Sequence, residues 1–225
     1  MTLTVFVTGT DTEIGKTHVS TALLRAAASA GLRVAGFKPV AAGCERTADG
    51  LRNDDALALM RASNVDLPYE QVNPVALAPP VAPHIAAAQA GVIIDGRRLL
   101  DGHAAIAAQA DLVVVEGAGG WQVPLGAGAG RFADWVAGAG WPVLLVVGMR
   151  LGCLNHALLS AESIRRQSRL AGWVANCLPP RQNFWEQNVA CLRDELASPC
   201  FGVVPTDADA AAHIDLGRLL DALAD

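Results

Sequence analysis

The sequence predicts an α/β fold of three layers, in which a mostly parallel sheet carries helices on both faces. Short runs rich in Val, Leu and Ile alternate with longer segments of helical periodicity along the whole chain. The strand candidates are almost continuously apolar, as expected for strands that are covered on both sides. Because strand and helix alternate strictly, we expect right-handed crossovers and parallel pairing.

The apolar runs place strands at Leu3–Thr8, Arg33–Val40, Leu112–Glu116, Val143–Val147, Gly172–Cys177 and Cys200–Val204. Helical patterns lie between them, at Lys16–Ala30 (closed by Gly31), Asp54–Ala62, His84–Ala90, Gly96–Gln109, Arg131–Gly138, Leu154–Arg166 and Asn183–Leu196. The Pro-rich segment 79–83 and the Gly-rich segment 126–130 are predicted to be loops. No linker is long enough to divide the 225 residues, so we expect a single domain over residues 1–225.

Composition narrows the class of protein. With 52% hydrophobic and 17% charged residues, the chain is expected to be globular. A net charge of −5 without a basic cluster argues against nucleic-acid binding. The longest apolar stretch, 141–147, is far shorter than the roughly 20 residues of a membrane span. The chain enters a strand at once, without a cleavable leader, and its five cysteines contain no Cys-x-x-Cys pair, so we expect a cytoplasmic protein with reduced thiols.

The segment Gly9-Thr-Asp-Thr-Glu-Ile-Gly-Lys-Thr17 lies between the first strand and the first helix. A strand, a glycine-bounded loop ending in Gly-Lys-Thr and a helix together predict a P-loop that binds a nucleoside triphosphate. Lys16 would reach the terminal phosphates and Thr17 would contact Mg²⁺. Five residues separate Gly9 from Gly15 where four are usual, so either Thr10 replaces the first glycine or the loop is longer. A plain strand-turn-helix joint is the disfavoured alternative.

The acidic residues of this loop predict a second ligand. Asp11 and Glu13 would repel phosphates unless a cation or a cationic substrate group lies beside them. We therefore expect a ligand that carries amines.

Ligands of such sheets gather at the carboxyl ends of the strands, so polar residues there are candidates for the site. Lys38 ends an internal strand and is expected to neutralise a phosphoryl group, although a surface lysine is the alternative. Asp54 and Asp55 open a helix, and either one is a candidate magnesium ligand or merely complements the helix dipole. Glu116 ends a buried run, where a carboxylate needs a cation, and we expect it to hold Mg²⁺.

Three further segments at the carboxyl ends of the strands are candidates for binding the nucleotide or a carboxylate. The glycines of 117–120 predict a flexible loop that approaches phosphates closely. Asn176 ends a strand and is suited to a purine edge, without a choice between adenine and guanine. Residues 150–156 start a helix whose free N–H groups could hold a carboxylate.

The sequence resembles the dethiobiotin synthetase family. The resemblance is carried by the stretches VTGTDTEIGKT (7–17), AGFKPV (35–40), GLRNDDALAL (50–59), VNP (72–74), PHI (83–85), VEGAGGW (115–121), LGCLNH (151–156) and GWVAN (172–176). They occur in order from about residue 4 to residue 206 and include the unusual acidic P-loop.

This resemblance implies a homodimer of P-loop subunits that uses ATP and Mg²⁺ to convert 7,8-diaminononanoate and carbon dioxide into dethiobiotin, ADP and phosphate. An amine would capture carbon dioxide as a carbamate. The carbamate would attack the γ-phosphate to form a carbamic-phosphoric anhydride, and the second amine would close the ring.

The resemblance also implies roles for individual residues. Lys16, Lys38 and Thr12 would be catalytic, and Thr17, Asp55 and Glu116 would hold Mg²⁺, which selects Asp55 over Asp54. The diamine or its carbamate would contact Thr12, Lys38, Ala42, Gly119 and Asn155. The residues implied to bind the nucleotide with its metal are Glu13, Ile14, Gly15, Lys16, Thr17, His18, Asp55, Glu116, Gly117, Ala118, Gly119, Asn176, Cys177, Pro205, Thr206 and Asp207.

The chain departs from the family at Ala42, where serine is common, and at Arg150, where lysine is common. A regulatory P-loop ATPase is the rival interpretation, but such proteins commonly carry a second lysine early in the loop, and Thr10-Asp11 has none. A related amidating ligase would need a glutamine-hydrolysing domain that does not fit in this length.

Overall fold

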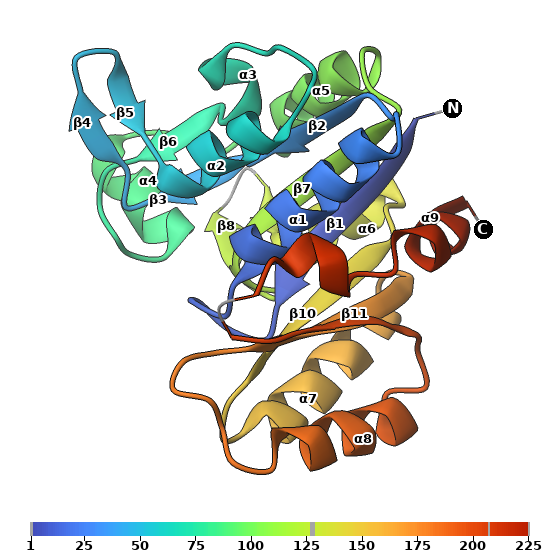
Figure 1. Cartoon of the computed structure of the whole chain (residues 1–225). Helices are drawn as coiled ribbons and strands as arrows, with labels where there is room; N and C mark the ends of the chain where they lie inside the picture. The colour runs from blue at the N-terminus through green and yellow to red at the C-terminus, as the bar shows by residue number, and fades with distance from the viewer. Residues whose placement is uncertain (1, 127–128, 207, 225) are drawn as a thin grey trace.

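A six-stranded parallel sheet forms the centre of the computed structural model, which describes residues 2–126, 129–206 and 208–224. Its strand order is β12-β11-β10-β1-β7-β2 (Figure 1). The strands are β1 (Leu3–Gly9), β2 (Val34–Phe37), β7 (Leu112–Gly120), β10 (Val143–Met149), β11 (Leu170–Cys177) and β12 (Cys200–Val204). Every predicted strand is present and every neighbouring pair is parallel, which confirms the predicted fold class.

Successive residues of each strand point to opposite faces of the sheet and fill two cores. Phe6 and Val115 belong to one core, whereas Val5, Val7 and Val114 belong to the other. The first core is completed by α5 (Gly96–Ala107), α6 (Phe132–Ala139), α7 (Cys153–Arg165) and α8 (Trp185–Glu195). The second is completed by α1 (Lys16–Ser29), the 3₁₀ helix η1 (Ala210–His213) and α9 (Leu216–Ala224), which lie on the viewer's side of the sheet in Figure 1. Helices therefore cover both faces.

Short elements extend the fold beyond the carboxyl end of β2 (Figure 1). They are the parallel pair β3 (Val40–Ala42) and β6 (Val75–Leu77), the hairpin β4 (Glu45–Thr47) and β5 (Gly50–Arg52), the helices α2 (Asp54–Ala62), α3 (Tyr69–Val72) and α4 (Pro83–Ala90), and the pair β8 (Pro124–Gly126) and β9 (Gly130–Arg131). Most of these elements were not predicted, because two- to four-residue segments carry too little periodicity.

Two strand predictions need correction. The predicted strand Arg33–Val40 stops at Phe37 and lies at the edge of the central sheet, so the prediction of an internal strand before Lys38 is wrong. The chain resumes at Val40 in a separate sheet with β6. Pro39 lacks an N–H group for a ladder bond, which accounts for the break. The predicted glycine loop 117–120 is wrong, because β7 continues through these residues and Gly120 pairs with Gly9 of β1. A Cβ atom at position 117 would lie 2.8 Å from Phe6, so glycine allows the strand to pass close to this ring.

The helix predictions are correct to within a few residues. His84 lies inside α4, which begins at Pro83, and α8 begins later than predicted, at Trp185. Part of the predicted loop 126–130 forms the β8–β9 pair, while residues 127–128 lie outside the described residues. Within the described part of the chain, no helix is long and apolar enough to cross a bilayer. Its cysteines form no disulfide there.

Candidate active site

The P-loop connects the end of β1 at Gly9 to the start of α1 at Lys16. Gly15 has a φ of +84°, a conformation that favours glycine. A Cβ atom there would approach the side-chain nitrogen of Asn176 to 2.1 Å, so this position also has no room for a side chain. Asn176 is the next-to-last residue of β11 (Leu170–Cys177) and donates from Nδ2 to the carbonyl of Ile14 at 2.9 Å. This bond holds the P-loop against β11. The same residue, Asn176, is the one predicted to contact the purine.

Lys16 is a nearly buried cation with no carboxylate bound to it among the described residues. Its Nζ donates to the backbone carbonyl of Asp11 at 2.8 Å, which draws the side chain back along the loop. Burial lowers the pKa of Lys16, and the nearby charge of Lys38 lowers it further, to about 8. A phosphate could therefore take the place of the Asp11 carbonyl and pair with the Lys16 ammonium, which forms no ion pair within the described residues.

One of the two acidic P-loop residues, Asp11, forms an ion pair with a cationic side chain of the same chain. The carboxylate of Asp11 accepts from the backbone N–H of Thr12 at 2.7 Å and forms an ion pair with Arg150, in the segment after β10. Arg150 therefore meets part of the predicted requirement for a positive group beside Asp11. Glu13 is exposed and has a φ of +57°.

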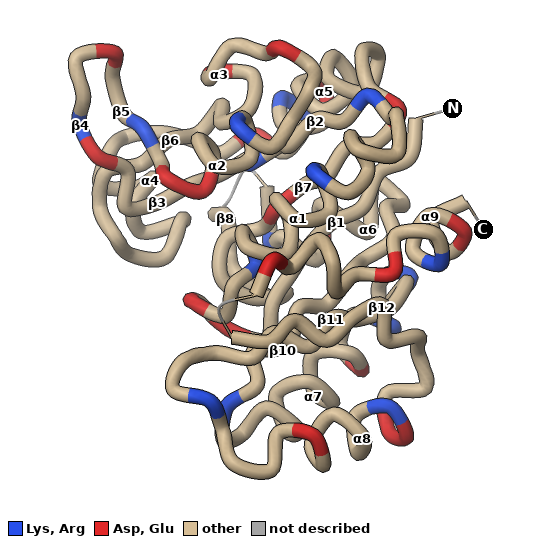
Figure 2. Tube along the Cα trace, in the orientation of Figure 1, with Lys and Arg blue, Asp and Glu red and all other residues tan. Residues whose placement is uncertain are grey.

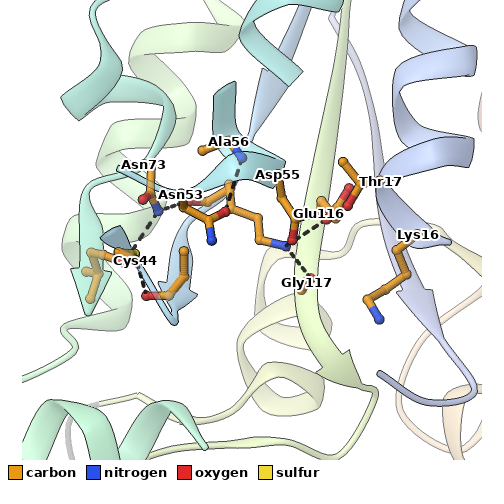
Figure 3. Close-up of polar contacts among 12 residues, drawn as sticks. Lys16, Thr17, Cys44, Asn53, Asp55, Ala56, Asn73, Glu116 and Gly117 are labelled. Carbon is orange, nitrogen blue, oxygen red and sulfur yellow. Dashed lines mark hydrogen bonds and ion pairs between the residues drawn. The ribbon is translucent and has the colours of Figure 1, made fainter. Parts of the chain in front are cut away.

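The centre of the site is a charge cluster formed by the buried Lys38 and Glu116 and the partly exposed Asp55 (Figure 3). Lys38 Nζ donates to Glu116 Oε1 at 2.7 Å, to Asp55 Oδ2 at 2.8 Å and to the carbonyl of Gly117 at 3.2 Å. Burial alone would lower the pKa of Lys38, but the two carboxylates outweigh it and raise the pKa above its ordinary value. Lys38 is 3% exposed, so it is not the surface lysine of the alternative interpretation.

Thr17 joins the same cluster from the first turn of α1. Its hydroxyl donates to Glu116 Oε1 at 2.9 Å, and Figure 3 shows it facing Glu116. Glu116 is 0% exposed, and its second oxygen, Oε2, is buried without a hydrogen-bond partner. A buried carboxylate oxygen without a donor is costly unless a cation completes it.

The donors present here suit Mg²⁺. Magnesium usually takes one or two carboxylates together with phosphate oxygens and water. Glu116, Asp55 and the Thr17 hydroxyl provide such a set beside the P-loop. Within the described residues, no group of three His, Cys, Asp or Glu side chains offers a metal site made of protein ligands alone.

Of the two candidate acidic residues Asp54 and Asp55, only Asp55 contacts the cluster within the described residues. Asn53 caps α2 by accepting from the N–H of Ala56 at 3.2 Å, and this cap orients the first helical turn. Asp55 reaches Lys38 from that turn, whereas Asp54 is exposed. Burial raises the pKa of Asp55, but the Lys38 ammonium outweighs this effect and holds the pKa below its ordinary value.

A cavity of about 820 Å³ opens beside these groups, within the usual range for small-molecule sites. It is lined by the predicted residues Thr12, Glu13, Gly15, Lys16, Thr17, Lys38, Ala42, Asp55, Ala118 and Gly119, and also by Ala41, Asn53, Pro80, Val81, Ala82, Pro83 and Val123. Most of the lining comes from the P-loop, the start of α2, β7 and residues 80–83 before α4. The sequence predicts a loop at this last segment but no role in the site.

Other predicted residues lie outside this lining. Glu116 and the carbonyl of Gly117 contact Lys38, which lines the cavity, and Ile14 is fully buried in the P-loop. Asn176, Cys177, Pro205 and Thr206 gather behind the P-loop, where Thr206 Oγ1 donates to the carbonyl of Cys177 at 3.2 Å. His18 and Asn155 are exposed, and Asn155 lies on α7. Asp207 lies outside the described residues.

One signal in the sequence that would have pointed to the site is the scarcity of lysine. Lys16 and Lys38 are the only lysines of the chain, and the other cationic side chains are arginines. Figure 2 shows these arginines interspersed with acidic residues along the trace. Tyr69, Asn73 and the Asp11–Arg150 pair were not singled out as site residues, although each contacts a segment that carries one.

The chain is similar to known proteins over nearly its whole length. The family model described as an AAA domain matches residues 3–213. A curated relative from Pseudomonas paraeruginosa, named ATP-dependent dethiobiotin synthetase BioD, is 55% identical over 221 residues, which are 95% of this chain and 96% of the relative. The protein of the same name from Cellvibrio japonicus is 52% identical over 96% of this chain and 97% of its own.

Solved structures show similarity in fold alone. A ParA family ATPase from Chlorobium tepidum has a TM-score of 0.58 and 13% identity over 99% of this chain and 91% of its own. The septum site-determining protein MinD from Pyrococcus horikoshii, complexed with Mg-ADP, has a TM-score of 0.57 and 14% identity over 98% of this chain and 96% of its own. These P-loop proteins confirm the predicted fold family.

Proposed function

The chain belongs to the family of ATP-dependent dethiobiotin synthetases, and on this premise we propose a route and a role for each group of its site. It is a ligase that forms dethiobiotin with ATP. The substrate is 7,8-diaminononanoate, one amine of which takes up carbon dioxide as a carbamate. A carbamate oxygen attacks the γ-phosphorus and releases ADP. The second amine then attacks the carbamoyl carbon, closes the ureido ring and expels phosphate.

The observation that carries this proposal is the position of two lysines at one cavity, where Lys38 is paired with the carboxylates of Asp55 and Glu116. Lys16 and Lys38 approach the same cavity from the P-loop and from the connection after β2. A pair of ammonium groups stabilises the negative charge that spreads over the carbamate and γ-phosphate during transfer, a mainly electrostatic contribution. Thr12 and Gly119 also line the cavity and would hold carbamate and phosphate oxygens.

Mg²⁺ would be held by Thr17, Asp55 and Glu116. The unpartnered Oε2 of Glu116 and the carboxylate of Asp55 support this assignment. When bound, the ion would neutralise phosphate charge and orient the triphosphate. Lys38 already neutralises both carboxylates, so it prevents their mutual repulsion before the ion arrives.

The nucleotide base would lie behind the P-loop, beside Asn176, Cys177, Pro205 and Thr206. One Nδ2 proton of Asn176 is bound to Ile14, which leaves the rest of its amide for adenine. For Asp207 we rely on the resemblance alone. Ile14, His18, Gly117 and Ala118 would complete the nucleotide contacts.

The carboxylate tail of the diamine would bind near Asn155 at the start of α7. Asn155 does not line the cavity and is exposed, which favours a tail site completed across a homodimer interface. Ala42 lines the cavity but offers no hydroxyl, so backbone would replace one substrate hydrogen bond. We also propose a cytoplasmic location, supported by cysteines that form no disulfide in the described residues.

The decisive experiment follows the oxygen atoms of carbon dioxide. With purified protein, Mg-ATP and the diamine, a short incubation with C¹⁸O₂ should place one ¹⁸O atom in each released phosphate and yield dethiobiotin by mass. The atom is transferred because the carbamate oxygen that attacks phosphorus leaves with the phosphate. Omission of the diamine or of carbon dioxide is the control. Phosphate release that needs neither, without a ureido product, would instead indicate a regulatory ATPase.

A further inference from the structure

We propose that Tyr69 and Asn73 are positioning residues that set the distance between Lys38 and Asp55. This inference rests on the proposed function, because it assigns the two residues to the same charge cluster. Both side chains are buried, and neither lines the cavity.

The first step concerns the backbone of Lys38. This residue follows β2 and precedes Pro39, so its own N–H and C=O groups have no partner in the central sheet. The N–H donates to the carbonyl of Val72 at 2.8 Å, and the carbonyl accepts from Asn73 Nδ2 at 2.7 Å. Buried backbone groups need such partners. Residues 72–73 therefore bind both the N–H and the C=O group of Lys38 and fix its backbone.

The second step concerns α2, which carries Asp55. The backbone N–H of its capping residue, Asn53, donates to the Tyr69 hydroxyl at 2.8 Å. That hydroxyl in turn donates to Asn73 Oδ1 at 2.9 Å. Tyr69 therefore connects the start of α2 to the side chain that holds Lys38.

Together these bonds close a ring. It runs from the Lys38 carbonyl through Asn73, Tyr69 and Asn53 to Asp55, and returns through the 2.8 Å contact between Asp55 Oδ2 and Lys38 Nζ. Figure 3 shows Asn53 and Asn73 on the side of the cluster opposite Thr17 and Lys16. The ring holds Lys38 and the start of α2 at a fixed separation, although no sheet hydrogen bond joins these two segments. This matters because small displacements of catalytic groups strongly reduce reaction rates.

The test removes the hydroxyl and keeps the aromatic ring. In Tyr69→Phe, kcat should fall about tenfold, while KM for ATP should change less than about twofold, because the P-loop is untouched. Ser63→Ala is the matched control. Ser63 lies at the other end of α2, where its hydroxyl accepts from the N–H of Gly36 at 2.9 Å and donates to the carbonyl of Leu59 at 2.8 Å.

Ser63→Ala should lower Tm about as much as Tyr69→Phe but leave kcat within about twofold of the wild type. Equal kcat in Tyr69→Phe and Ser63→Ala would overturn the positioning role. If Tyr69→Phe does not fold, Asn73→Asp serves instead. It keeps the volume and the acceptor for Tyr69, but its oxygen faces the Lys38 carbonyl without a donor, and an unchanged kcat in that variant would equally overturn the inference.

A Lys38→Met arm separates this inference from the proposed function. Normal turnover in Lys38→Met would contradict the proposed site itself, whatever Tyr69→Phe does. An inactive Lys38→Met together with an unaffected Tyr69→Phe would contradict only the ring.

Discussion

Lys38 and His103 are both buried bases, but they lie in opposite kinds of surroundings. Lys38 lies in the charge cluster at the carboxyl ends of the strands and contacts two carboxylates. His103 lies on α5 in an aromatic layer, with its ring 4.2 Å from that of Trp141 and a 3.0 Å hydrogen bond between its Nε2 and the Thr4 hydroxyl. Burial lowers the pKa of His103 to about 4, whereas the carboxylates raise the pKa of Lys38.

The comparison shows that burial alone does not decide whether a base keeps its charge. Burial lowers the pKa of either base, and the two carboxylates beside Lys38 reverse the effect there. Lys16 is intermediate, because its carboxylate neighbours act from a distance and its pKa settles at about 8. The site thus has one cation paired with two carboxylates and a second one, Lys16, whose bond within the described residues is to a backbone carbonyl.

Replacement of Lys38 should produce the largest effect. In Lys38→Met, kcat should fall by about 10²–10³-fold, because the main cation beside the transferred phosphoryl group is lost. Stability should also fall by about 3–5 kcal/mol, because Glu116 stays buried with only Thr17 as a donor. Steady-state kinetics and denaturant unfolding measure the two effects.

A second variant separates these effects. Lys38→Met combined with Glu116→Gln removes both buried charges, so stability should return while turnover stays lost. If turnover returned together with stability, the role of Lys38 would be structural and the chemical assignment would be wrong.

Replacement of Lys16 should have a smaller effect and leave stability intact. In Lys16→Gln, KM for ATP should rise and kcat should fall by about 10–10²-fold, because one phosphate contact loses its charge. Since burial already penalises the charged form of Lys16, its removal should not destabilise the fold. Nucleotide titration and thermal unfolding give the two readouts, and a loss of stability equal to that of Lys38→Met would contradict the contrast between the two lysines.

The sequence revealed those parts of the site that depend on local patterns. The P-loop follows from Gly15-Lys16-Thr17 between a strand and a helix, and Glu116 follows from a carboxylate after a buried run. The predicted strands all occur, because their apolar runs reflect coverage on both faces.

What the sequence did not reveal depends on contacts between distant segments. Arg150 meets Asp11 across 139 positions, and Tyr69 belongs to a four-residue helix without usable periodicity. The strand through residues 117–120 was missed because glycine predicts flexibility, whereas the neighbouring β1 supplies the partners that order it. Position in the chain alone did not choose between Asp54 and Asp55. The resemblance selected Asp55, and the structure adds the contact between Asp55 and Lys38.

The smallest predicted effect concerns His103 and leaves catalysis untouched. Between about pH 6.5 and pH 4, the unfolded chain binds a proton at His103 that the folded chain does not, so the folded state loses stability as pH falls through this window. The shift corresponds to about 3 kcal/mol at most. His103→Gln removes this proton uptake, so its stability relative to the wild type should improve as pH falls from 7 to 4, measured by urea unfolding.

The control for this prediction is His156→Gln, because His156 is exposed on α7. Its stability should follow that of the wild type across the same pH range, since acid titration of the carboxylates is common to both. Turnover of His103→Gln at pH 7.5 should equal that of the wild type, because the ring lies outside the cavity lining. A constant difference between His103→Gln and the wild type from pH 7 to pH 4 would mean that His103 takes up its proton at the same pH in the folded and unfolded chains. Burial without an acidic partner would then not suffice to neutralise a base in this protein.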